Sequence, residues 1–192
     1  MNAPFDLRLD KAAFDRWLLS QEQKYEWKEG RVVQMNNVTR DHASVVSNIL
    51  HALRNRLESR LWRVVASDFG VEDQNFVRFP DVLVEPKKSG TPPKGRRSHD
   101  ATVLFEVLSP ASVDTDLIEK PEEYMALPTL EAYVVASQDA AICWLWQRDP
   151  AGRLFRAKPV RIAGRDQMVP LAALGIELPL AEIYEDIATA DD

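Results

Sequence analysis

The clearest periodic pattern in the chain lies between Asp41 and Arg60. Apolar residues recur there at fourfold spacing, with Val46 and Leu50 alongside: Val45, Ile49, Leu53 and Leu57. This spacing gathers the apolar side chains on one face and predicts an amphipathic helix that packs against a core. A shorter helix is predicted from Leu9 to Leu19, with Asp10 as its candidate N-cap.

Apolar runs elsewhere predict strands. The segment KYEWKEGRVVQM has two extended runs around Glu29-Gly30 and predicts a β-hairpin. From Leu61 onward, WRVVAS, NFVRFPDVLVE, ATVLFEVLS, EAYVVAS and AICWLWQR are each typical of a strand. A helix is expected between Asp114 and Leu127, and a short one within Leu178 to Ile187. This order predicts an α/β fold, a single domain over residues 1–192 with a mixed central β-sheet flanked by helices.

Composition narrows the function classes. The chain has 192 residues, 45% of them apolar, which suits one core of ordinary size. Its 24 Lys and Arg against 30 Asp and Glu give a net charge of −6, which argues against a protein that holds nucleic acid by bulk electrostatic attraction alone. A polyanion would need a local basic patch or a bound cation. Cys143 lies in an apolar run and predicts a buried thiol. No signal-peptide pattern or membrane-length apolar run is present, so we expect a cytoplasmic protein.

Two carboxylates interrupt strand-like apolar runs. Asp81 follows Pro80 and precedes VLV, while Glu106 is enclosed by VLF and VL. Burying an unpaired carboxylate costs several kcal/mol, so a compensating charge is required. On neighbouring strands the two acids could converge on a hard divalent cation, Mg²⁺ or Mn²⁺. Alternatively, each acid points to solvent or pairs with an arginine such as Arg78.

A cationic candidate, Lys120, follows Glu106 on the next predicted helix. On a helix, Asp116, Lys120 and Tyr124 would share one face, which could direct the ammonium toward the sheet. Pro121 disfavours the α conformation at the residue before it, so the helix could instead begin at Pro121 and leave Lys120 at its entrance. A solvated lysine in DLIEKPEE is the competing interpretation.

Several segments together resemble a known family. They are PD at 80–81, FEVLSP at 105–110 and DLIEKPEEYMALPTLEAYVV at 116–135, with YEWKEGRVVQM, DHASVV and LPLAEIYED at matching places. In this order they resemble the Uma-type restriction endonuclease family of the PD-(D/E)XK nuclease superfamily. The resemblance covers nearly the whole chain.

The resemblance implies a restriction-endonuclease-like fold and metal-dependent hydrolysis of phosphodiester bonds in DNA. It assigns Asp81 and Glu106 as ligands of Mg²⁺ or Mn²⁺, with the backbone carbonyl of Val107 as a third ligand. The wider superfamily places a lysine two residues after the second acid, where this chain has Leu108. The family resembled here carries its lysine on the following helix, which corresponds to Lys120. It also implies a homodimer.

Glu26 and His42 are further candidates. Glu26 lies between Tyr25 and Trp27 and matches an acid of the family's first hairpin, which could bind the metal or a water. A salt bridge or an exposed position is the alternative. His42, in the first turn of the long helix, could orient a carboxylate or assist proton transfer, or could simply be a capping residue. No Cys or His spacing supports a zinc site.

Two other features bear on partners. The basic segment KKSGTPPKGRR at 87–97 is expected beside the site, where it could clamp a phosphate backbone or simply remain solvated. Trp144 and Trp146 alternate on one strand and so face one side, either in the core or at an oligomer interface.

The sequence therefore predicts a Mg²⁺-dependent endodeoxyribonuclease, with Asp81, Glu106, Lys120, Glu26 and His42 as catalytic candidates. The lysine after Val107 is missing and Pro121 adjoins Lys120, so one alternative is a catalytically weakened nuclease-fold domain that binds nucleic acid or a protein partner. A purely structural alternative pairs the strand acids with arginines.

Overall fold

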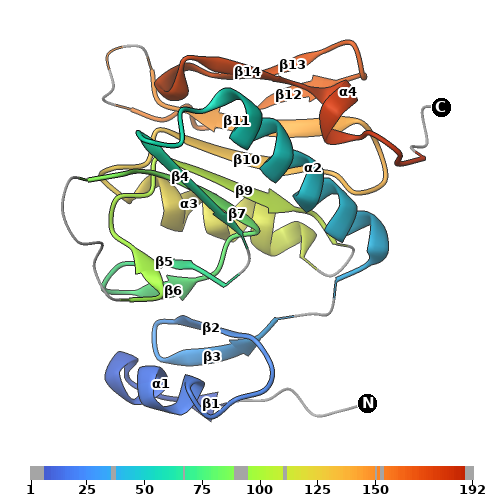
Figure 1. Cartoon of the computed structure of the whole chain (residues 1–192). Helices are drawn as coiled ribbons and strands as arrows, with labels where there is room; N and C mark the ends of the chain where they lie inside the picture. The colour runs from blue at the N-terminus through green and yellow to red at the C-terminus, as the bar shows by residue number, and fades with distance from the viewer. Residues whose placement is uncertain are drawn as a thin grey trace.

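The computed structural model describes residues 7–35, 38–66, 68–88, 95–109, 112–149, 151 and 154–188. Within these residues the chain forms two six-stranded sheets and a two-stranded sheet, with helices packed on their faces (Figure 1).

The central sheet has the strand order β12-β11-β10-β9-β7-β4. β9 and β10 are parallel and the other pairs are antiparallel, so the sheet is mixed. Helix α2 (Arg40–Arg56) covers one face, and α3 (Lys120–Met125) lies on the other (Figure 1). This confirms the predicted α/β fold. The strand bounds are β4 Trp62–Ala66, β7 Val82–Pro86, β9 Val103–Val107, β10 Ala132–Ala136, β11 Ile142–Gln147 and β12 Val160–Ala163.

Side-chain alternation on β9 divides the core in two. Val103, Phe105 and Val107 belong to the cluster that packs against α2, whereas Leu104 belongs to the cluster that contains Tyr124 of α3. Successive side chains of a strand point to opposite faces, so Glu106 shares the α3 face with Leu104. The position of Glu106 within the strand thus decides which helix it meets.

The second sheet has the order β1-β3-β2-β6-β5-β8. Helix α1 (Lys11–Leu18), capped by Asp10 as predicted, packs Phe14 and Trp17 against one face of it. The predicted hairpin is confirmed as β2 and β3, with positive φ at Glu29 and Gly30 in the turn. The strand bounds are β1 Leu7–Arg8, β2 Tyr25–Lys28, β3 Arg31–Gln34, β5 Gly70–Glu72, β6 Phe76–Arg78 and β8 Arg97–Ser98.

The run NFVRFPDVLVE, predicted as one strand, is in fact two. β6 ends at Arg78 in the second sheet and β7 begins at Val82 in the central sheet. Pro80 carries no N–H to continue a ladder, so the chain leaves one sheet and enters the other at this point. This crossing places Arg78 and Asp81 at the junction of the two sheets.

The helix expected between Asp114 and Leu127 begins before Lys120, not at Pro121. Thr115–Glu119 form a π-helical turn that continues directly into α3, and the N–H of Lys120 donates to the carbonyl of Thr115. The wider turn keeps Lys120 helical, with φ −61° and ψ −34°, despite the proline that follows. Lys120 is therefore held inside a continuous helical segment.

The remaining elements pack on the side of the central sheet that carries α2. β13 (Met168–Leu171) and β14 (Ile176–Pro179) form a hairpin through the 3₁₀ turn Ala172–Leu174, and α4 (Leu180–Ile183) contacts α2. Cys143 is buried as predicted, and burial raises the pKa of its thiol to about 12. Trp146 is buried and stacks on Tyr133 with ring centroids 5.4 Å apart, so it belongs to the core.

Gly70 permits the close approach of β5 to the chain crossing. A Cβ atom at this position would lie 2.6 Å from the carbonyl oxygen of Arg78 and 3.1 Å from the ring of Phe79. We predict that Gly70→Ala lowers the free energy of unfolding by about 1–3 kcal/mol, because the backbone of β6 must shift. Urea denaturation measures this change. In Gly95→Ala the new Cβ meets no atom within 4 Å, so the change should stay within about 0.5 kcal/mol. Equal effects of the two substitutions would contradict the packing described.

Candidate active site

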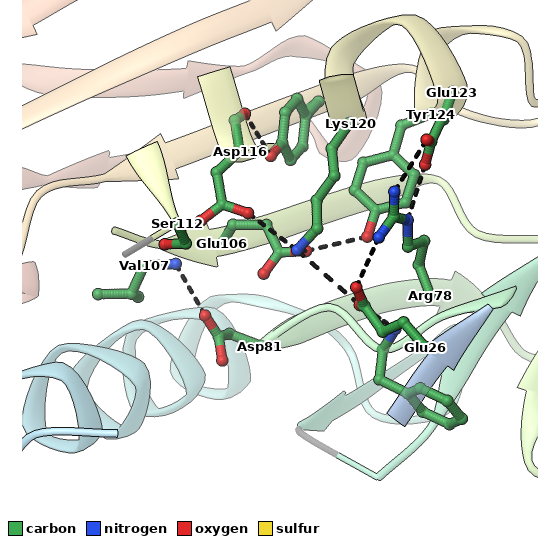
Figure 2. Close-up of polar contacts among 12 residues, drawn as sticks. Glu26, Arg78, Asp81, Glu106, Val107, Ser112, Asp116, Lys120, Glu123 and Tyr124 are labelled. Carbon is green, nitrogen blue, oxygen red and sulfur yellow. Dashed lines mark hydrogen bonds and ion pairs between the residues drawn. The ribbon is translucent and has the colours of Figure 1, made fainter. Parts of the chain in front are cut away.

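A cleft of about 340 Å³ opens where the two sheets and the helical segment 115–125 meet. Its lining includes all five predicted side chains: Glu26, His42, Asp81, Glu106 and Lys120. They come from β2, α2, the residue before β7, β9 and α3, so residues from 26 to 120 converge at one place. Figure 2 shows four of them, Glu26, Asp81, Glu106 and Lys120.

Asp81 and Glu106 face each other across the antiparallel pair β7 and β9. Val82 pairs with Phe105 and Leu83 with Leu104, so this register, continued by one residue to Asp81 just before β7, brings Asp81 opposite Glu106. The N–H of Val107 donates to Oδ2 of Asp81 at 2.8 Å. In a strand, the N–H and C=O of one residue point to the same flank. The carbonyl of Val107 therefore also lies on the Asp81 flank.

Glu106 is almost fully buried and has two hydrogen-bond donors on one oxygen. Its Oε1 accepts from Nζ of Lys120 at 2.7 Å and from the hydroxyl of Tyr124 at 2.9 Å. Burial raises the pKa of Glu106 well above its usual value; Lys120 opposes this effect, whereas the nearby carboxylates add to it. The surroundings thus carry an excess of negative charge around this carboxyl group.

Lys120 lies among three carboxylates (Figure 2). Its Nζ is 2.7 Å from Glu106 Oε1, 2.9 Å from Asp116 Oδ1 and 3.9 Å from Glu26 Oε1. Burial disfavours the charged amine, but the three carboxylates outweigh burial and raise the pKa of Lys120. The side chain is therefore an ammonium that points into the cleft, and the interpretation as a solvated lysine is wrong.

Glu26 is held by Arg78, the last residue of β6. Nη1 of Arg78 donates to Glu26 Oε2 at 2.7 Å, and the N–H of Phe79 donates to Oε1 at 3.1 Å. The same guanidinium binds both oxygens of Glu123, at 2.7 and 2.9 Å. Although burial acts to raise the pKa of Glu26, Lys120 and Arg78 lower it overall. Glu26 is thus a buried, ionised carboxylate.

His42 contacts Asp81 from the first turn of α2. Thr39 caps this helix by accepting from the N–H of His42, and Nε2 of the imidazole lies 3.2 Å from Asp81 Oδ2. Asp81 Oδ2 therefore accepts a hydrogen bond from the N–H of Val107 and also contacts the imidazole of His42.

The basic segment 87–97 is placed differently from the prediction, as far as the structure describes it. Residues 89–94 lie outside the described residues. Arg97, on the far edge strand β8, pairs with Asp15 and Glu72, and Lys88 pairs with Asp100. None of the described residues of this segment lines the cleft, because β6 and β5 separate β8 from the hairpin that carries Glu26.

Three residues of the site received no role in the sequence analysis: Asp116, Tyr124 and Glu123. A signal was available for two of them, because Asp116 and Tyr124 share a helix face with Lys120. Arg78 was considered only as a partner for the strand acids, and it does bind one acid, Glu26.

The donor chemistry of the cleft suits a hard cation. In the described part of the chain, no three His, Cys, Asp or Glu side chains lie close enough to ligate one metal ion. Mg²⁺, however, commonly uses one or two carboxylates and completes its shell with waters and substrate phosphates. The hydrogen bonds described above use Oδ2 of Asp81 and Oε1 of Glu106, which leaves the second oxygen of each for another ligand. These residues therefore fit a Mg²⁺ or Mn²⁺ ion.

The fold is shared with a solved structure. The chain aligns with a protein from Anabaena variabilis ATCC 29413 described as "a putative nuclease belonging to DUF820", with a TM-score of 0.71 and 14% sequence identity. The alignment covers 88% of this chain and 96% of that one. This chain is thus an α/β protein with the fold of that structure. In this chain, acids from both six-stranded sheets and a lysine of the helical segment line one cleft.

Residues 12–181 match the family described as "Putative restriction endonuclease" (Uma2). The chain belongs to this family, as the resemblance in its sequence indicated. No curated protein matches the chain. Among the described residues, no helix is long and apolar enough to span a membrane.

Arg78 should be essential for stability. It is 2% exposed and binds Glu26 and Glu123, so its removal leaves two carboxylates without their main partner. We predict that Arg78→Met lowers the free energy of unfolding by about 3–5 kcal/mol, measured by urea denaturation.

Two controls sharpen this test. Arg60→Met, at a side chain that is 80% exposed, should change the free energy by less than about 0.5 kcal/mol. Adding Glu26→Gln to Arg78→Met should recover part of the loss, because one uncompensated charge disappears. A double variant as unstable as the sum of the two single variants would show that the two residues do not interact.

Proposed function

We propose that this protein is a metal-dependent endonuclease that hydrolyses phosphodiester bonds in DNA. The observation that carries the proposal is the register of β7 and β9, which sets Asp81 opposite Glu106 beside the ammonium of Lys120. Membership of a family described as restriction endonucleases supports a nuclease.

Each residue has a definable part in such a reaction. Asp81, Glu106 and the carbonyl of Val107 would hold Mg²⁺ or Mn²⁺. When bound, this ion would polarise a phosphate oxygen and favour ionisation of a water molecule. His42 fixes the orientation of Asp81 through Oδ2, and Tyr124 fixes Glu106 through Oε1.

Lys120 serves as a donor in this proposal. As an ammonium it can orient the attacking water and stabilise charge that develops on the phosphate. Glu26 lies 3.9 Å from Nζ of Lys120 and is anchored by Arg78, so it helps to hold the ammonium between the sheet and the helix.

We further propose that the protein acts as a homodimer, since cutting both strands of a duplex calls for two sites. The Trp144 and Trp146 face contributes little to such an interface, because Trp146 is buried in the core.

A second candidate is a catalytically weakened domain that binds nucleic acid or a protein partner. It is favoured by the ion pairs of Lys120 with Glu106 and Asp116, because an ammonium bound to two carboxylates is less free to contact a substrate. This candidate predicts that the cation binds without cleavage.

The test is cleavage of supercoiled plasmid in Mg²⁺ or Mn²⁺, with EDTA as the blank. We predict nicking that Asp81→Asn and Glu106→Gln each reduce at least about 100-fold, because each removes a charge at the site. Glu177→Gln, at an exposed acid on β14, should cleave normally.

Melting temperature separates the two candidates. Free cation at 100 times its dissociation constant stabilises a single site by about 2.7 kcal/mol, or roughly 5–10 °C for a chain of this size. A cation-induced rise in melting temperature that requires both Asp81 and Glu106, together with no cleavage of any substrate, would favour the weakened domain. If neither cleavage nor a rise occurred, the cation site would be refuted.

A further inference from the structure

A row of cations crosses the strands at the mouth of the cleft. Arg31 of β3 is the register partner of Arg8 on β1 and of Lys28 on β2. Directly opposed residues of an antiparallel sheet share one face, so the three cationic side chains stand side by side. With adjacent strands about 4.8 Å apart, the row spans roughly 10 Å.

This face of the hairpin is the one that looks into the cleft. Tyr25, Trp27 and Val32 pack against α1, whereas Glu26, Lys28, Arg31 and Val33 line the cleft. The row therefore begins at Lys28, two residues along β2 from Glu26 and on the same face.

Like charges placed opposite each other destabilise a sheet, by roughly 0.2–1 kcal/mol for a pair. Lys28 is compensated, with Nζ 3.0 Å from Glu119 and 2.8 Å from Glu123. Arg31 is exposed and, among the residues that the structure describes, makes no ion pair or side-chain hydrogen bond. An exposed guanidinium without an acidic partner in the middle of this row can accept an anionic ligand.

The other cations in the described lining of the cleft are already bound to acids. Arg78 binds Glu26 and Glu123, and Lys120 binds Glu106 and Asp116. An anionic substrate that approaches this acidic cleft thus meets Arg31, which among the described lining residues is the cation without an acidic partner. Beside it, Val33 and Val38 are 45% and 59% exposed and also line the cleft, which offers an apolar surface next to the cation.

We propose that Arg31 binds a backbone phosphate of the polynucleotide adjacent to the bond that is cut, with Val33 in contact with the neighbouring sugar or base. Arg is suited to this contact because its planar guanidinium can hold two phosphate oxygens at once. This inference rests on the proposed nuclease function, and it assigns substrate binding to the side chains of β3 that line the cleft.

The test is binding of a fluorescent oligonucleotide, followed by anisotropy in Ca²⁺ over a range of salt concentrations, with single-stranded and duplex arms. Loss of one phosphate contact reduces the slope of log K against log [salt] by about 0.9 for duplex and about 0.7 for a single strand. We expect Arg31→Ala to show this reduction on the preferred substrate and to weaken binding roughly tenfold. Arg31→Lys should keep the slope, because it keeps the charge.

Arg60→Ala is the matched control. Arg60 is exposed and lies beyond the C-terminal end of α2, a helix of 17 residues, about 25 Å long, whose first turn carries His42. Wild-type slope and affinity in Arg31→Ala, or failure of the wild-type protein to bind either oligonucleotide, would overturn the inference. Because the assay requires no cleavage, Arg31-dependent binding without turnover would refute only the proposed nuclease. Normal cleavage with binding unaffected by Arg31→Ala would refute only the phosphate contact.

Discussion

The structure of the site depends on the burial of several carboxylates around two cations. Glu26, Glu106 and Asp116 surround the ammonium of Lys120, and the guanidinium of Arg78 joins Glu26 to Glu123. Isolated charges would not be stable in these surroundings, so each element that supplies one is held to the others. The β2 strand, the end of β6, β9 and α3 are tied together in this way. With Asp81 nearby, negative charge exceeds positive charge, which favours the uptake of a cation.

Backbone irregularities position this network. Pro80 ends β6 and lets the chain cross between the sheets, so Arg78 serves one sheet while Asp81 opens a strand of the other. The π turn before Lys120 lets the helix accept Pro121 and still keep Asp116 and Lys120 in contact at i, i+4. π turns of this kind occur frequently at functional sites. At both places a proline adjoins a charged residue of the site: Pro80 precedes Asp81, and Pro121 follows Lys120.

Much of this arrangement could be predicted from the sequence, and the limits have physical causes. The spacing of Val45, Ile49 and Leu53 was sufficient to predict α2, and the apolar runs predicted every strand of the central sheet except β12. Beyond the β2–β3 hairpin, the second sheet could not be predicted as a separate sheet, because its strands are short and pair across long sequence separations, as β2 does with β6. Local sequence also cannot show that Arg78 binds Glu26, since the two are 52 residues apart. The i, i+4 relation of Asp116 and Lys120 was visible, but Pro121 obscured the helix that creates it.

The proposed chemistry depends on the binding of a divalent cation by Asp81 and Glu106, next to Lys120. A crystal grown with Mn²⁺ and measured at the manganese absorption edge would locate this ion by anomalous scattering, without reference to activity. We expect one strong anomalous peak within about 2.0–2.3 Å of a carboxylate oxygen of each acid, on the flank of the Val107 carbonyl. A fully loaded crystal with no peak in the cleft, or with a peak that only other residues contact, would contradict it.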